Sequence, residues 1–244
     1  MPAEACQEVL AVAYVGSDAG KLTIRVNDVT LISGLRGALP NFVPPSLLLE
    51  GENHLTLELD AEDATANVRA EVFKGCRGEF PGAPGENRNV LAQISLEGTG
   101  ARTVSFPISG LPDYSYLSAA PSDDKGLLDA IEAMRDAARH GDVDGYLAYF
   151  QPMLDDFVLD GEASAAQLIR GMVSQLLGDG FTVADSGDLT VRPVLGGRVF
   201  QVEDGRGDGP MQFRPSGAGG DTPDKIAQAS FWINTGDGWK VLRQ

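Results

Sequence analysis

The chain has 244 residues, with 35 acidic and 19 basic side chains and a formal net charge of −16. Its hydrophobic content of 43% and charged content of 22% are those of an ordinary globular protein, which argues against a disordered or fibrous chain. The negative charge is spread along the sequence, so its field disfavours nucleic acid and anionic membrane and favours a basic partner.

The first half of the chain reads as short strands separated by turns. In Lys21–Val26 apolar and polar residues alternate, as in a half-buried strand, and Asn27–Asp28 follows as a turn. Gly51–Asn53 is predicted to be a second turn, before an alternating strand over Leu55–Leu59. Strands over Val9–Tyr14, Val29–Ile32, Val68–Phe73, Val90–Leu96 and Arg102–Ile108 bring the expected total to about seven, which is typical of a β-sandwich.

Two segments of this half carry a resemblance to a known family. They are Arg25–Val26–Asn27–Asp28 and Leu49–Glu50–Gly51–Glu52–Asn53–His54–Leu55. They resemble turn and strand-entry motifs of the galactose-binding-like jelly-roll domains, in which glycine is usual where Asp28 stands. The resemblance implies a sandwich topology, and it opens the alternative of a carbohydrate-binding module.

The pattern changes near Pro121, where helical periodicity replaces alternation. Apolar residues predict a helix near Leu127–Ala138, a short helix from Asp142 that ends at Pro152, and a helix near Ala165–Leu177. In the third helix Leu168, Ile169, Met172, Val173 and Leu176 are expected to face inward. We therefore expect an α+β chain of two domains, a β-sandwich in 1–120 and a second domain in 121–244.

Strands return after the third helix. Leu189–Leu195 and Arg198–Val202 flank a Gly196–Gly197 hairpin turn, and Pro210–Arg214, Ala227–Asn234 and Trp239–Leu242 follow. In this half the helices therefore come first and the strands follow.

Two segments of this second half carry a resemblance to a known family: Ala138–Tyr146, which contains a G-D-x-D helix turn, and the closing hairpin Phe231–Val241. They resemble motifs of the cone-shaped α+β fold of the SnoaL-like and nuclear-transport-factor-two-like superfamily. The resemblance implies helices packed on a curved antiparallel sheet. Members include small-molecule enzymes and non-catalytic modules, and some form dimers through the outer sheet face, so a homodimer through the C-terminal sheet is one expectation.

An enzyme on such a fold would use a carboxylate as acid or base in an apolar pocket. Asp155 and Asp156 are the candidates, with Tyr149 as a hydrogen-bond donor. The alternative is that these carboxylates belong to an acidic loop that faces water. Trp232, Arg214 and Tyr146 are candidate binding residues, although Tyr146 and Trp232 also suit a core position.

Cysteine and histidine are too few for a disulfide framework or a structural zinc site, so we expect no metal or cofactor. Cys6 and Cys76 are expected to be free thiols, with the alternative that they pair in an oxidising compartment. The first residues lack the features of a signal peptide, which favours the cytoplasm; a leader that had been removed would place the chain in the periplasm.

No motif points to a particular reaction. The leading hypothesis is a non-enzymatic bacterial two-domain protein that binds a basic protein partner, such as an immunity or accessory protein. The alternatives are a SnoaL-like enzyme of small molecules and a carbohydrate-binding module.

Overall fold

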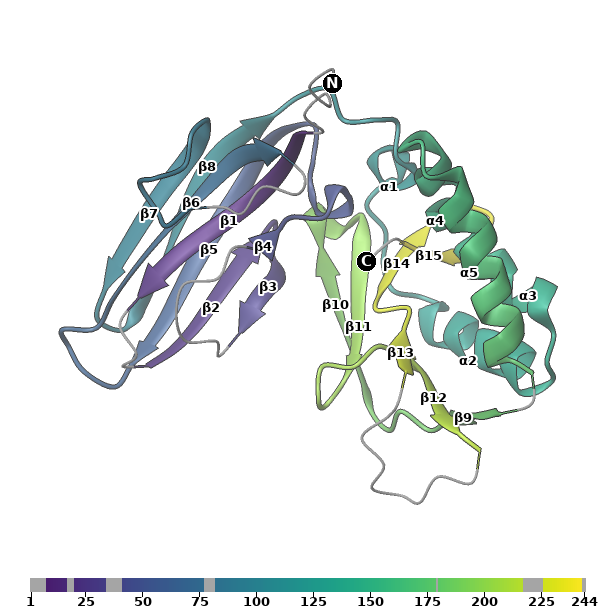
Figure 1. Cartoon of the computed structure of the whole chain (residues 1–244). Coiled ribbons are helices and arrows are strands. Elements are labelled where there is room, and N and C mark those ends of the chain that lie inside the picture. Colours follow the sequence, from purple (N-terminus) through teal and green to yellow (C-terminus); the bar gives the residue numbers. More distant parts are fainter. Residues whose placement is uncertain are drawn as a thin grey trace. The chain divides into compact units, whose positions relative to one another are not determined.

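The computed structural model describes residues 8–16, 20–33, 41–76, 82–178, 180–216 and 226–242. The chain divides into two compact units, Met1–Leu111 (unit 1) and Pro112–Gln244 (unit 2) (Figure 1). Residues 112–120, which the sequence analysis assigned to the first domain, lie in unit 2. Antiparallel sheets and helices are both present, so the expected α+β class is confirmed.

Eight described strands of unit 1 form two antiparallel sheets, with the strand orders β4-β1-β6-β7 and β3-β2-β5-β8. The two sheets pack against each other (Figure 1). The strands are β1 (Glu8–Gly16), β2 (Gly20–Val26), β3 (Val29–Ser33), β4 (Asn41–Phe42), β5 (Gly51–Ala61), β6 (Asn67–Cys76), β7 (Val90–Glu97) and β8 (Gly100–Ile108), with a short 3-10 turn, η1 (Pro45–Leu47), after β4.

Alternation in the sequence becomes a buried face in β2 and β5. Leu22, Ile24 and Val26 are buried in β2, while the residues between them are half-buried or exposed. Each fully buried aliphatic side chain contributes roughly 1.5–3 kcal/mol of hydrophobic stabilisation. Leu55 and Leu57 repeat the pattern on β5, so the strand predictions for both segments are confirmed.

A tight turn joins β2 to β3 at Asn27 and Asp28. Both residues have positive φ values, 50° and 70°, and Val26 pairs directly with Val29. Positive φ at both central residues is the requirement of a two-residue hairpin turn, and Asn and Asp accept it better than other non-glycine residues. The turn predicted from the sequence lies here.

The sequence predicted a turn at Gly51–Asn53, but Asn53 lies in β5. Its side chain is fully buried. Its Oδ1 accepts from the amide of Asn27 and from the backbone N–H of Leu49, each at 2.7 Å. Its Nδ2 donates to the carbonyls of Leu49 (2.8 Å) and Gly51 (3.1 Å). The Asn therefore satisfies the backbone where the chain enters the strand, which is why it carries a turn-like signature.

Cys76 ends β6 and is disulfide-bonded. The expectation of a free thiol is therefore wrong for this residue. The chain's other cysteine, Cys6, lies outside the described residues.

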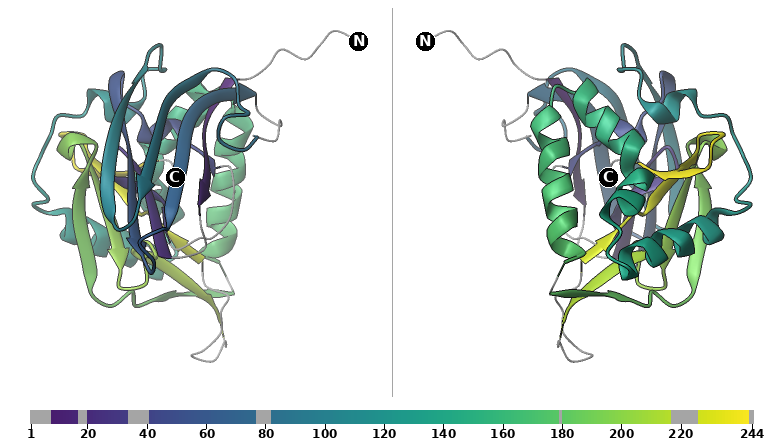
Figure 2. Two further views of the ribbon diagram at one scale, coloured as in Figure 1. Left: turned by 90° about the vertical axis from the view of Figure 1, so that its left-hand side faces the viewer. Right: turned by 90° about the vertical axis from the view of Figure 1, so that its right-hand side faces the viewer.

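Unit 2 places its helices on one side of its strands (Figure 1). In the right-hand view of Figure 2, α5 runs crosswise to α2. The helical elements are α1 (Ser115–Ser118), α2 (Leu127–Arg139), α3 (Val143–Leu147), η2 (Ala148–Phe150), α4 (Gln151–Leu159) and α5 (Ala163–Leu176).

The strands of unit 2 form two sheets, with the orders β10-β11-β14-β15 and β13-β12-β9. The segment predicted as one strand, 227–234, is two strands: the chain breaks at Ala229, which has a φ of 66°, and joins a different sheet on each side. The strands are β9 (Phe181–Ala184), β10 (Leu189–Val194), β11 (Val199–Asp204), β12 (Met211–Pro215), β13 (Ile226–Gln228), β14 (Phe231–Asn234) and β15 (Trp239–Val241), with η3 (Leu195–Gly197) between β10 and β11.

Helix α5 is anchored on one narrow edge. Val173 and Leu176 are its buried residues, whereas Leu168 and Met172 are 65% and 57% exposed. The expectation that all five apolar residues face inward is therefore wrong for Leu168, and Met172 is not buried. The physical reason is that an apolar arc this wide exceeds the surface that α4 and the strands offer to the helix.

We predict that Asn53→Ala destabilises the protein by about 2–4 kcal/mol, because it leaves several buried donors and acceptors without partners. Urea unfolding of the full chain measures the change. Glu58→Ala is the control: Glu58 lies on the same strand with an exposed ion pair to Arg25, and its loss should cost at most about 1 kcal/mol. Equal effects of the two substitutions would contradict the assignment.

We predict that Gly171→Ala stabilises α5 by roughly 0.5–1 kcal/mol, because glycine is a poor helix residue and an added Cβ there meets no atom within 4 Å. Gly145→Ala in α3 is the matched control. Its Cβ would lie 2.2 Å from Oδ2 of Asp142, which caps that helix, so it should destabilise the protein. Thermal unfolding measures both variants, and a shift of their midpoints in the same direction relative to wild type would refute this account.

Candidate functional site

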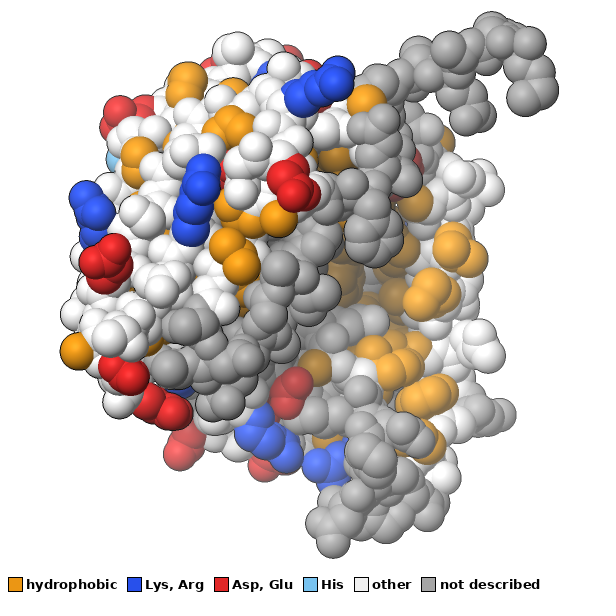
Figure 3. Space-filling model, turned by 60° about the vertical axis from the view of Figure 1, so that its left-hand side comes forward, with side chains coloured by type: hydrophobic (Ala, Val, Ile, Leu, Met, Phe, Trp, Pro, Cys, Tyr) orange, Lys and Arg blue, Asp and Glu red, His pale blue; other side chains and the backbone are white. Residues whose placement is uncertain are grey.

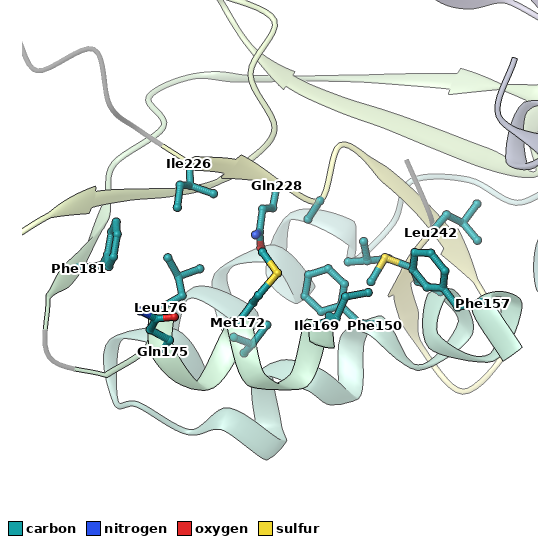
Figure 4. A pocket seen from close by; sticks show the side chains of 14 residues that line it. Phe150, Phe157, Ile169, Met172, Gln175, Leu176, Phe181, Ile226, Gln228 and Leu242 are labelled. Atoms are coloured by element: carbon teal, nitrogen blue, oxygen red, sulfur yellow. The ribbon is translucent and has the colours of Figure 1, made fainter. Parts of the chain in front are cut away.

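Unit 2 contains a cavity of about 410 Å³ between its helices and its strands (Figure 4). This lies within the range of roughly 300–1,000 Å³ found for small-molecule sites. On the helical side it is lined by Phe150 of η2, two residues of α4 and five of α5: Met153, Phe157, Ile169, Met172, Val173, Gln175 and Leu176.

The opposite wall comes from the strands and their ends. In Figure 4 the side chains of Ile226 and Gln228 on β13 point across the cavity toward Met172 and Leu176 on α5. The lining residues of this wall are Phe181, Ile226, Gln228, Ala229, Val241 and Leu242.

None of the described residues that line the cavity is charged. Its polar side chains are two amides, Gln175 and Gln228. Met172 and Ile226 line the cavity and are also exposed, at 57% and 39%, so the cavity opens to solvent at this rim. Such a surface binds through apolar contact and can add one or two neutral hydrogen bonds.

Behind the wall, Tyr146 of α3 is fully buried, and its hydroxyl donates to Oε1 of Gln228 at 3.1 Å. Burial raises the pKa of this phenol, which therefore remains a neutral donor. The bond fixes the orientation of the Gln228 amide. Tyr146, a candidate binding residue, thus acts next to the cavity without lining it.

Asp155 lies away from this cavity. It is exposed on α4, accepts a hydrogen bond from Gln151 at 2.8 Å, and borders a separate polar depression that also contains Lys240 and Asp237. Asp155 therefore faces water, as the alternative to a catalytic role expected, but it lies on a helix and not on the acidic loop predicted there.

Asp156 is buried, with 1% of its surface exposed, but it too lies outside the lining of the cavity. Its Oδ1 accepts from the backbone N–H and the hydroxyl of Ser115, at 3.1 and 3.2 Å, and Oδ2 has no hydrogen-bond partner in the described structure. Burial raises the pKa of this carboxyl group, and the hydrogen bonds from Ser115 oppose that shift. Its evident role is to hold α1 on α4.

Tyr149 is half-buried and packs edge-on against Trp232, with ring centroids 6.2 Å apart. The ammonium of Lys240 lies 5.5 Å from the centre of the tyrosine ring. Desolvation raises the pKa of Tyr149. The structure therefore does not bring Tyr149, Asp155 and Asp156 together around one pocket.

Trp232 is fully buried, and its indole N–H donates to the carbonyl of Ala229 at 2.5 Å. Arg214 is half-buried on β12. Neither candidate lines the cavity.

Sequence reasoning missed Gln228 and the cavity itself. The available signal was the broad apolar arc of α5, with more apolar residues than one packed face requires. The partner strand β13 carries no such signal, because three residues are too few to show a period.

No helix in the described parts of the chain has the length and apolarity needed to cross a membrane. Comparison with family models, curated proteins and solved structures finds no match to this chain.

The raised pKa of Asp156 predicts a pH dependence. The folded state disfavours the charged carboxylate of Asp156. The contribution of this group to stability is therefore fully present below the ordinary Asp pKa of 3.8 and is lost as pH rises through the higher folded value. Asp156→Asn keeps an acceptor for Ser115 and removes the charge. The difference in unfolding free energy between Asp156→Asn and wild type should therefore shift in favour of the variant by about 1–3 kcal/mol as pH rises from 3.5 to 7.

Urea unfolding at both pH values measures this gain. Asp155→Asn, which removes an exposed carboxylate from the same helix, is the control for the general effect of net charge. A stability difference between Asp156→Asn and wild type that stays constant with pH would show that burial of Asp156 carries no such cost.

Proposed function

We propose that this chain is a non-enzymatic binding protein whose second unit holds a small apolar molecule. The observation that carries the proposal is the cavity of about 410 Å³ with an uncharged, almost wholly apolar lining. At roughly 30 Å³ for a group the size of a water molecule, it encloses on the order of a dozen non-hydrogen atoms, and a somewhat larger ligand can extend through the open rim at Met172 and Ile226. Covering the exposed rim side chains Met172 and Ile226 would add hydrophobic free energy to binding.

We propose further that unit 1 is a β-sandwich and unit 2 a cone-shaped α+β fold, as the sequence resemblances implied. For unit 1 the support is the pair of packed four-stranded antiparallel sheets. For unit 2 it is the order of helices before strands and the break at Ala229, which sends one stretch of chain into two sheets.

Enzymatic use of Asp155, Asp156 and Tyr149 has less support. General acid–base chemistry needs the acid or base within hydrogen-bond reach of the bound molecule. None of these three side chains lines the apolar cavity, and the polar depression that Asp155 borders is open to water.

The expectation of a basic protein partner rests on the net charge of −16. On the face shown in Figure 3, acidic and basic side chains are interspersed.

Carbohydrate binding by unit 1 would need an aromatic platform for stacking. Of its aromatic side chains within the described ranges, Phe42 is the exposed one, at 51%.

The disulfide at Cys76 supports the periplasm, the alternative to the cytoplasm in the sequence analysis. Disulfides persist in oxidising surroundings such as the periplasm and are rare in a reducing cytosol. We therefore propose a periplasmic or extracellular place of action.

Titration with the neutral fluorophore N-phenyl-1-naphthylamine tests the binding function, because its emission rises in an apolar site. We predict saturable binding by the full chain, and a loss of at least about tenfold in affinity for Ile169→Trp, whose indole would occupy the cavity.

Leu168→Trp is the matched control. It adds the same indole to the neighbouring residue of α5, which is 65% exposed and does not line the cavity, so affinity should stay within about twofold of wild type. Absence of saturable binding, or equal losses in the two variants, would refute the proposed function.

A further inference from the structure

We infer that the cavity selects an uncharged molecule that carries one hydrogen-bond acceptor, such as a ketone or ester, and that Nε2 of Gln228 meets that acceptor. This inference rests on the proposed function and narrows its ligand class. It draws on the hydrogen bonding behind the cavity wall and on the charges around the cavity.

The buried Tyr146 hydroxyl sets the direction of the amide. A hydroxyl inside an apolar core needs a partner, and Oε1 of Gln228 accepts from it at 3.1 Å. One lone pair of the carbonyl oxygen is thereby used by the core hydroxyl, and the NH₂ group is the part of Gln228 without a described partner.

That NH₂ group donates to no described residue, and Gln228 is half-buried, so its side chain keeps contact with solvent. In Figure 4 the end of the Gln228 side chain points into the cavity, toward Met172. An amide NH₂ is a donor only, so the group it binds must be an acceptor.

The absence of charge from the described lining disfavours any ligand whose charge would lie inside the cavity. A carboxylate or an ammonium in this cavity would lose hydration and find no opposite charge to replace it. A neutral ligand without an acceptor would displace water from Nε2 and leave the donor unpaired. A neutral acceptor avoids both costs.

Four probes of similar size separate these cases: 1-phenylbutan-1-one (neutral acceptor), butylbenzene (no acceptor), 4-phenylbutanoate (anion) and 4-phenylbutylammonium (cation). Their affinities are measured at pH 7 by displacement of N-phenyl-1-naphthylamine from the full chain. We expect the two ions to bind at least about tenfold more weakly than the ketone.

The decisive quantity is the ratio of the ketone and butylbenzene affinities, which cancels general effects on the cavity. Gln228→Leu should reduce the ketone preference by about tenfold, since it removes the donor. Gln175→Leu removes the other lining amide and is the matched control, for which the ratio should not change.

Gln228→Glu is the second variant, and it retains an acceptor for the Tyr146 hydroxyl if the leucine variant fails to fold. It should lose the ketone preference and gain affinity for the ammonium probe by about tenfold or more.

The inference is overturned if wild type prefers an ion, or if the affinity ratio is unchanged in both Gln228 variants. In those outcomes the fluorophore still binds, so the proposed function stands. If neither the fluorophore nor any probe binds to wild type, the proposed function and this inference both fail.

Discussion

The hydroxyl group of Tyr146 imposes the constraint on which the arrangement of unit 2 depends. It lies in an apolar core, and an unpaired hydroxyl there would cost about 1–3 kcal/mol. Its acceptor is Gln228, the last residue of β13, so the bond links α3 to that strand. Directly after it the chain turns at Ala229 and leaves for the other sheet. This one hydrogen bond therefore lies both at a sheet boundary and at one wall of the cavity.

Bulky side chains line both walls of the cavity. Phe150 and Phe157 lie on the helical side and Phe181 on the strand side. Val173 and Leu176 are the buried residues of α5 and pack its edge against the core. The remaining apolar residues of the helix are left facing the cavity or the solvent, which explains why Met172 does both.

Sequence patterns predicted the parts of the fold that follow from local periodicity. The alternation in β2 and β5 gave the correct buried faces, because a strand has only two sides. The pattern of α5 gave the helix correctly and its orientation incorrectly, since the number of apolar residues does not say how much surface a neighbour offers. The break at Ala229 was missed because nothing local marks alanine as a residue with positive φ. Gln228 was missed for a related reason: its role comes from Tyr146, which is 82 positions away in the sequence.

The side-chain amides of the two units differ in how many of their donors and acceptors have hydrogen-bond partners. In unit 1, Asn27 and Asn53 satisfy each other and the surrounding backbone: each NH₂ group makes two hydrogen bonds, and each carbonyl accepts at least one. An amide whose role is structural is expected to be saturated in this way, because unpaired polar groups are costly inside a protein. Gln228 uses its oxygen on Tyr146 and leaves its nitrogen facing accessible space in an otherwise apolar cavity. Asymmetry of this kind is what a site requires when the missing partner belongs to another molecule.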